Sequence, residues 1–276
     1  MKAGTYNPYR EFNEWLNDIL FGALGLGWLA DYVDQKMGGH LAAYYTMVYL
    51  RDLVAGTLVY WVTGGLWHLT VYGIFGKTLF DDKKRDYPDP ALIRRQQFHA
   101  QTSVFVYAGL PALSEFLIES KLTKVYFYVD EIGGMHMYAL FFFVYLACVE
   151  IGIYWMHRTL HTNKWLYNNI HGPHHSYKTR EQLTPWASIA FHPIDGILQA
   201  SPYVACLFFV PAHYFTHFVM LFFSGVWATN IHDAVPVNSE PIMGAKYHTM
   251  HHTHFVYVFC SFFFPSYSLL LPACML

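Results

Sequence analysis

Residues 132–161 read IGGMHMYALFFFVYLACVEIGIYWMHRTLH, and this stretch decides the fold that we expect for the chain. Positions 132–149 carry no charged side chain, and the apolar run continues to Met156, which is long enough for a helix to cross a bilayer. The run ends in His157 and His161, which are four positions apart and therefore share one helix face. Because imidazole is the commonest metal ligand, the stretch predicts a membrane helix that ends in a metal site.

Two further histidine clusters repeat this arrangement. Residues 171–175 read HGPHH and residues 248–252 read HTMHH, so both have the pattern HxxHH. Positions i, i+3 and i+4 lie on one side of a helix, and each cluster can therefore direct its imidazoles to one point. The three clusters together contain eight candidate metal ligands: His157, His161, His171, His174, His175, His248, His251 and His252.

The number of clustered histidines favours iron over zinc. A structural zinc ion usually takes four ligands in a closed site, and the three clusters offer eight imidazoles. Nitrogen ligands suit redox-active first-row metals, and two irons with open positions could bind O2. A structural zinc protein, or a set of histidines that only form hydrogen bonds, are the alternatives.

The composition indicates a membrane protein. The chain has 276 residues, of which 54% are hydrophobic and 13% charged, whereas about 25% of the residues of a soluble domain are charged. The net charge is −2 and no long basic run occurs, which argues against nucleic acid as a partner. The four cysteines form no CxxC pair, so we expect apolar packing residues rather than zinc ligands.

Further uncharged runs predict the membrane topology. Residues 53–75 contain no charge and form the first predicted span, and residues 97–118 form the second. The basic loop 76–97 separates them, and the positive-inside rule places this loop in the cytosol. The second span then leads away from the cytosol and the third returns, so that His157 emerges at the cytosolic surface.

The stretch 196–231 is also uncharged, and Pro202 and Pro211 should break it into a membrane hairpin whose two ends lie on the same side. All three histidine clusters then face the cytosol. We therefore predict an all-α fold, an integral membrane helical bundle with a cytosolic, histidine-rich di-metal site. Its expected parts are an N-terminal region (1–52), transmembrane helices (53–156), a catalytic region that includes the hairpin (157–253) and an atypical apolar tail (254–276).

Other polar residues are candidates for roles around the metals. His192 and His232 lie outside the three clusters and are further candidate ligands. Ligating histidines usually hydrogen-bond to a carboxylate or a carbonyl through their second nitrogen. The candidate carboxylates are Glu150, Glu181, Asp195 and Asp233. His213 and His217 lie within an apolar run, and we expect both to be helix-packing or interface residues.

The three clusters, in this order and spacing, resemble those of the fatty acid hydroxylase/sterol desaturase superfamily. The surrounding sequence sharpens the match. The segments VEIGIYWMHR (149–158), AFHPIDGILQA (190–200) and WATNIHD (227–233) resemble those of sterol C5-desaturases, also called lathosterol oxidases, and most closely those of plants. The resemblance covers about residues 50–253.

This resemblance implies a non-haem di-iron oxidoreductase that passes several times through the membrane of the endoplasmic reticulum. Such an enzyme would use O2 and two electrons from NAD(P)H, which cytochrome b5 and its reductase would deliver. It would introduce a C5=C6 double bond into a Δ7-sterol in sterol biosynthesis. The eight cluster histidines would be the iron ligands, and His192 and His232 match histidines of the family pattern. Sterol and membrane lipid would be its small-molecule partners.

The resemblance ends after Thr253. From His254 the chain continues as an uncharged apolar tail, where family members have a polar stretch followed by an acidic and aromatic helix. Besides a sterol C5-desaturase, two functions therefore stay open. The chain could be a sterol C4-methyl oxidase or lipid hydroxylase of the same superfamily. It could also be a catalytically inactive isoform with an aberrant C-terminus that still binds membrane, sterol or partner subunits.

Overall fold

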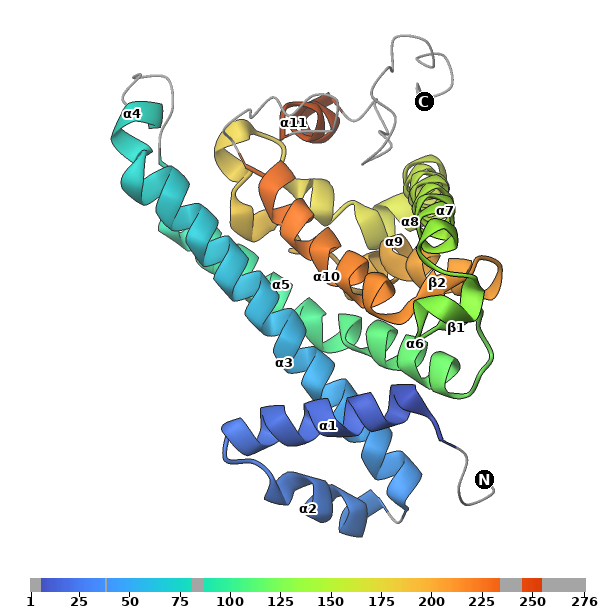
Figure 1. Cartoon of the computed structure of the whole chain (residues 1–276). Helices are drawn as coiled ribbons and strands as arrows, with labels where there is room; N and C mark the ends of the chain where they lie inside the picture. Colours follow the sequence, from blue (N-terminus) through green and yellow to red (C-terminus); the bar gives the residue numbers. More distant parts are fainter. Residues whose placement is uncertain (1–5, 38, 81–86, 234–244, 255–276) are drawn as a thin grey trace.

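The computed structural model describes residues 6–37, 39–80, 87–233 and 245–254, which form a mostly helical fold (Figure 1). The helices are α1 (Pro8–Ala23), α2 (Trp28–Met37), α3 (His40–His68), α4 (Gly76–Phe80), α5 (Pro90–Tyr107), α6 (Gly109–Glu119), α7 (Met135–Thr162), α8 (Lys164–Leu166), α9 (Pro193–Ala205), α10 (Tyr214–Ile231) and α11 (Ala245–His254). The π-helical turns are Leu69–Ile74 and Tyr167–His171, and the 3-10 turns are Val129–Ile132, His174–Ser176, Arg180–Gln182, Pro185–Ala187 and Cys206–Phe208. The predicted apolar tail, 254–276, lies outside the described residues except for His254.

Two very short strands depart from the all-α prediction within the described residues. β1 (Val125–Tyr126) pairs in parallel with β2 (Ala212–His213), and β2 leads directly into α10. Because β2 follows Pro211, the chain changes direction there, and the predicted break at Pro211 is confirmed.

Helix α9 runs through Pro202, where we expected a second break. A proline leaves the carbonyl four residues earlier without its helical amide donor, and the Ser201 hydroxyl instead donates to the Leu198 carbonyl at 2.8 Å. The proline ring packs against Gly152 of α7, where an added Cβ would lie 2.7 Å from the proline Cβ. The expectation was wrong because Pro202 lies in the last turn of α9 and because α7 offers a glycine at the contact.

The long helix α3 contacts α5, α6 and α10, and Figure 1 shows it crossing the length of the molecule. Near its C-terminal end, a Cβ added at Gly64 would lie 2.8 Å from the ring of Trp186. The indole therefore packs directly on the α3 backbone, which fixes the segment between the second histidine cluster and α9.

Among the described helices, α7 is the one that is long and apolar enough to cross a membrane. It contains the third predicted span except for its first three residues, 132–134. The predicted span 53–75 is shared between α3 and the π-helical turn that follows it. The predicted span 97–118 is divided between α5 and α6, because Pro111 cannot supply the amide that a continuous helix would need there.

A buried polar cluster, which we call the Arg51 cluster, joins α1 to α3, α6 and α10. Arg51 forms ion pairs with Glu115 and with the adjacent Asp52. It also donates to the side-chain carbonyls of Asn13 and Asn17, each at 3.2 Å. The remaining members, linked by hydrogen bonds through Asn13 or Glu119, are Glu119, Tyr44, Tyr45 and Tyr214.

Candidate metal centre

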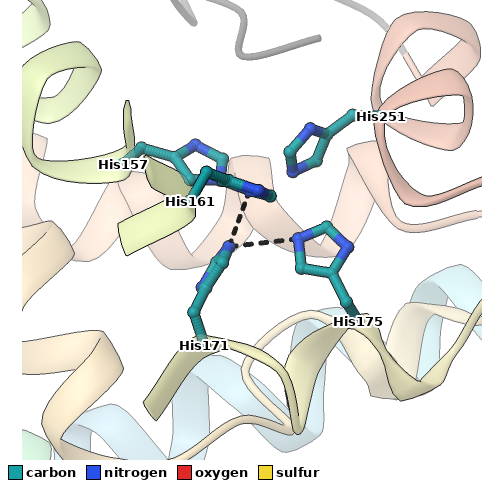
Figure 2. Close-up of side chains that lie close together, drawn as sticks. All are labelled: His157, His161, His171, His175 and His251. Carbon is teal, nitrogen blue, oxygen red and sulfur yellow. Dashed lines mark hydrogen bonds between the residues drawn. The ribbon is translucent and has the colours of Figure 1, made fainter. Parts of the chain in front are cut away.

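The first of two histidine groups brings together five imidazoles from α7, two successive turns and α11. The members of this five-histidine group are His157, His161, His171, His175 and His251. One ring nitrogen of each lies within 4.8 Å of the others. Figure 2 shows the five rings pointing toward one another, with dashed contacts from His171 to His161 and His175.

The second group contains four imidazoles that also lie within 4.8 Å of one another, and all four side chains are buried. The members of this four-histidine group are His174, His232, His248 and His252. His232 follows α10 directly and is the one member outside the three sequence clusters. The structure therefore brings this candidate ligand to the centre, together with all eight cluster histidines.

Each HxxHH cluster is divided between the two groups. His171 and His175 belong to the five-histidine group, whereas His174 belongs to the other. On α11 the division is reversed, because His251 alone joins the five-histidine group. The expectation that a cluster directs its imidazoles to one point was therefore wrong. Neighbouring helical residues differ in direction by about 100°, so positions i+3 and i+4 reach two centres that lie side by side.

A buried carboxylate fixes the ring of His171. Nδ1 of His171 donates to Oδ2 of Asp195 at 2.8 Å, and the Gln199 amide donates to the other carboxylate oxygen at 2.8 Å. A neutral imidazole carries one N–H, so Nε2 of His171 presents a lone pair. This lone pair faces Nε2 of both His161 and His175, each at 3.0 Å. The predicted role of Asp195 as a partner of a clustered histidine is confirmed.

A backbone carbonyl fixes the ring of His232. Its Nδ1 donates to the Ala228 carbonyl at 2.6 Å, so its Nε2 also presents a lone pair. That nitrogen lies 2.8 Å from Nε2 of His248 and 3.3 Å from Nε2 of His174. In both groups, therefore, the chain itself sets a ring so that its free nitrogen faces the other imidazoles.

The geometry fits metal ions better than hydrogen bonds. Neighbouring Nε2 atoms within the groups are 2.8–3.3 Å apart. Two nitrogens bound at about 2.1 Å to one ion, at right angles, would be about 3.0 Å apart. Hydrogen bonding would instead require the single lone pair of His171 to accept from two donors. The residues present therefore suit two adjacent metal ions.

Burial keeps the four-histidine group in the form that binds metal. Burial and the neighbouring imidazoles lower the pKa of His174, His248 and His252 well below the usual histidine value. Burial also lowers the pKa of His232 to about 4, although its hydrogen bond to Ala228 opposes this shift. Neutral imidazole is the ligating form, so these rings are ready to bind metal at neutral pH.

The other predicted polar residues lie elsewhere. His192 belongs to neither group; its Nδ1 accepts the amide of Ile194 at 3.2 Å and caps the start of α9. Asp233 accepts a hydrogen bond from the Tyr72 hydroxyl, at 3.3 Å. Glu150 is buried within α7, and Glu181 is exposed.

The packing role expected for His217 is confirmed. This buried ring hydrogen-bonds Tyr145 at 2.8 Å and Ser114 at 3.1 Å, and so ties α10 to α7 and α6. His213 lies in β2, directly before α10, where it pairs with Tyr126 in the short sheet and its side chain makes no capping hydrogen bond; it is therefore not within a helix.

An apolar cavity of about 280 Å³ adjoins both histidine groups. Its walls include His157 and His251 of one group and His174, His232 and His248 of the other. It also reaches Asp52, and the segment of α3 from Asp52 to Tyr60 alone covers about 12 Å. The cavity is therefore elongated, with the histidines at one end and the Arg51 cluster at the other.

Sequence reasoning missed the residues that shape this cavity. The polar residues of its wall include Tyr107, Ser188 and Gln199. None of them repeats at a helical spacing or lies in a histidine cluster. Their places depend on contacts between α5, α9 and the segment before α9, so a pattern within one segment could not reveal them.

Comparison with known proteins places the chain in a family. The fatty acid hydroxylase family matches residues 142–267. A Δ7-sterol-C5(6)-desaturase of Nicotiana tabacum is 40% identical over 210 residues, which cover 74% of each chain. A Δ7-sterol 5(6)-desaturase of Schizosaccharomyces pombe is 28% identical over 86% of this chain and 80% of the relative.

A mammalian relative agrees with these two. Rat lathosterol oxidase is 37% identical over 57% of this chain and 53% of its own length. No solved structure matches the chain. The histidine groups and these relatives agree, and the chain belongs to the sterol C5-desaturase family within the fatty acid hydroxylase/sterol desaturase superfamily.

Proposed function

We propose that the chain is a sterol C5-desaturase, an oxidoreductase that introduces a C5=C6 double bond into a Δ7-sterol. The observation that carries this proposal is the apolar cavity whose one end is formed by both histidine groups. A sterol is almost wholly apolar, and such a ligand suits an elongated cavity with mostly apolar walls. The names of the relatives from plant, yeast and rat support the choice of reaction.

We propose further that the nine grouped histidines hold two iron ions, one in each group. The iron centre would supply the oxidising power with which O2 removes hydrogen from an unactivated C–H bond. Asp195 and the Ala228 carbonyl orient His171 and His232 before any metal binds. His192, which caps α9, is not part of this set.

The chain's own residues would bind and orient the substrate. The ring of Phe191 lies 5.1 Å from the ring of His174, so an apolar wall continues directly from the four-histidine group. Ile231 and Trp227 line the cavity on the side of α10. These walls exclude water from the reacting carbons and hold the sterol in one orientation relative to the histidines.

A location in the membrane of the endoplasmic reticulum is part of the proposal. Large apolar side chains are exposed on several helices, for example Leu66 on α3, Phe98 on α5, Phe143 on α7 and Val219 on α10. Exposed apolar surface of this extent marks a membrane or protein interface. We infer that these helices form a multi-pass bundle with the histidines facing the cytosol, where cytochrome b5 and its reductase would deliver electrons from NAD(P)H.

Complementation tests the reaction directly. The full chain would be expressed in cells that lack sterol C5-desaturase, and their sterols would be identified by mass spectrometry. We expect Δ5,7-sterols to return with the wild-type chain and not with His174→Ala. His99→Ala serves as the matched control, because His99 is exposed on α5 and belongs to neither histidine group.

The same measurement separates the alternatives. Loss of a C4 methyl group or gain of a hydroxyl, without a new double bond, would identify a methyl oxidase or a hydroxylase instead. If no sterol changes although the protein is in the membrane, the chain is an inactive isoform. Replacing residues 254–276 with a C-terminus of the usual family type would then show whether the tail causes the inactivity.

A further inference from the structure

Two hydroxyl groups of the cavity wall make no hydrogen bond of ordinary distance and angle within the described residues, although the Tyr107 hydroxyl does interact with that of Ser103. They belong to Tyr107 of α5 and to Ser188, which lies between Trp186 and α9. Both oxygens are buried, and Ser188 as a whole is 1% exposed. A buried hydroxyl that makes no hydrogen bond costs free energy, so such groups usually have a partner. In a cavity with mostly apolar walls, the partner that fits is a polar group of the ligand.

Both hydroxyls belong to residues near Phe191, whose ring contacts the four-histidine group. The ring of Tyr107 lies 5.5 Å from that of Phe191, which itself lies 5.1 Å from the ring of His174. Ser188 is in the same short segment as Phe191. Tyr107 also packs on Gly196, where an added Cβ would lie 2.2 Å from its ring, so the absence of a side chain there makes room for the tyrosine.

Neighbouring polar groups are already engaged. The Ser103 hydroxyl, one turn before Tyr107, donates to the Phe191 carbonyl at 2.7 Å. The Gln199 amide donates to Asp195, and the Tyr60 hydroxyl donates to the Trp186 carbonyl at 3.0 Å. Within the described residues, the Ser188 hydroxyl has no partner and the Tyr107 hydroxyl interacts with Ser103, whose proton goes to Phe191, so both hydroxyls can still bind a polar ligand atom.

We propose that Tyr107 and Ser188 bind the hydroxyl group of the sterol and thereby select which carbons face the histidines. This proposal rests on the proposed function. A sterol carries its hydroxyl on C3, two bonds from C5, so a hydroxyl subsite for C5 desaturation must lie beside the metal centre. The positions of Tyr107 and Ser188 meet this requirement. The rest of the sterol then extends along the cavity toward α6 and Asp52.

The opposite orientation fails on distance. If the hydroxyl bound at Asp52, the reacting carbons would lie near the far end of the cavity, because the α3 segment from Asp52 to Tyr60 alone covers about 12 Å. The histidines would then face the sterol side chain instead of ring B. The place of the two hydroxyls thus predicts the site of reaction on the substrate as well as its binding.

The test compares two substrates and four proteins, in membranes that contain the full chain and its electron donors. The substrates are a Δ7-sterol and its 3-deoxy analogue, and the proteins are the wild type, Tyr107→Phe, Ser188→Ala and the double variant. We expect the wild type to prefer the sterol in kcat/KM by about 5- to 150-fold, the effect of one hydrogen bond to a buried group. Each single variant should reduce this preference. The double variant should bring the ratio of the two kcat/KM values close to one, because kcat/KM should fall for the sterol and stay unchanged for the 3-deoxy analogue.

Matched controls remove hydroxyls that have partners within the chain. Tyr49→Phe loses a hydrogen bond to the Phe105 carbonyl, and Ser201→Ala loses one to Leu198; neither residue lines the cavity. Both controls should keep the wild-type preference. Iron content equal to that of the wild type would show that the test variants fold.

Two outcomes count against the idea and can be told apart. A double variant that keeps the wild-type preference for the sterol would overturn the subsite while leaving the desaturase intact. A wild type that converts neither substrate would overturn the proposed function itself, and the subsite with it. Products desaturated or hydroxylated in the sterol side chain would show that the substrate lies in the opposite orientation.

Discussion

The Arg51 cluster and the two histidine groups are both buried and polar, but their groups are arranged in opposite ways. In the Arg51 cluster a cation faces carboxylates, with ion pairs from Arg51 to Asp52 and Glu115. Amide and hydroxyl groups add further hydrogen bonds, as Tyr44 does by donating to Glu119 at 2.5 Å. In the histidine groups, the lone pairs of His171 and His232 face the ring nitrogens of other imidazoles at about 3 Å.

This difference separates a structural site from a functional one. Opposite charges of the Arg51 cluster meet within the chain, so the cluster can hold α1 against α3 and α6 on its own. A lone pair that faces several imidazole nitrogens at once can accept a proton from one of them, whereas a cation between them attracts all of them. Two buried polar clusters of similar size thus point to different roles, and the test of each role is what happens when one member is removed.

Removal of a proposed iron ligand should have the largest effect. We expect His174→Ala or His251→Ala to abolish turnover, because each deletes a nitrogen from one of the two groups. The iron content of the purified protein should fall in both variants. His174→Ala should lose the ion of the four-histidine group, and His251→Ala should lose the ion of the five-histidine group. The loss of activity in these variants should exceed the roughly 10- to 100-fold loss that follows from changing a residue that supports a ligand. Full activity in either variant would count against the di-iron site.

Removal of Arg51 should instead reduce stability. Arg51→Met leaves buried carboxylates without their cation, which typically costs about 3–5 kcal/mol. The unfolding midpoint in detergent should fall steeply, while the iron content of the protein that remains folded stays at the wild-type level.

The double variant Arg51→Met/Glu115→Gln sharpens this prediction. Because it removes charge on both sides of the pair, it should recover part of the lost stability. If Arg51→Met lost iron without losing stability, the division between a structural and a functional cluster would be wrong.

The sequence predicted the members of the centre better than their arrangement. The clustered histidines could be named from their spacing, whereas His232 was a candidate together with His192, and Asp195 was one of four candidate carboxylates. The division of each HxxHH cluster could not, since it depends on where α7, α10 and α11 meet. The predicted helix break at Pro202 was wrong for the same reason, because the proline ring packs against Gly152 of another helix.

The carboxylate that supports His171 should have an intermediate effect. Asp195→Asn keeps the size of the side chain but weakens the hydrogen bond that holds the His171 proton on Nδ1. We expect the affinity for iron to fall by about 10- to 100-fold, as for other residues that support metal ligands. Titration of the metal-free protein with iron in competition with a chelator would measure this change.

A matched carboxylate outside the centre makes the comparison specific. Asp34→Asn alters an acid that contacts the exposed His40 and lies in neither buried cluster. It should leave iron affinity unchanged. Equal iron affinities for Asp195→Asn and the wild type would mean that the packing around His171, and not the Asp195 carboxylate, sets the orientation of its ring.

The smallest effect concerns the dependence of stability on pH. Burial lowers the pKa of His232 to about 4, from an ordinary value of 6.5. The folded state then binds fewer protons than the unfolded state between these two values, so the stability of the metal-free protein should fall as the pH falls below about 6.5. From pH 7 to 5.5 this residue alone should account for about 1 kcal/mol. His232→Asn should remove that share of the pH dependence, whereas Arg51→Met should lower stability without removing it. An identical pH dependence in wild type and His232→Asn would show that this imidazole is not buried in its neutral form.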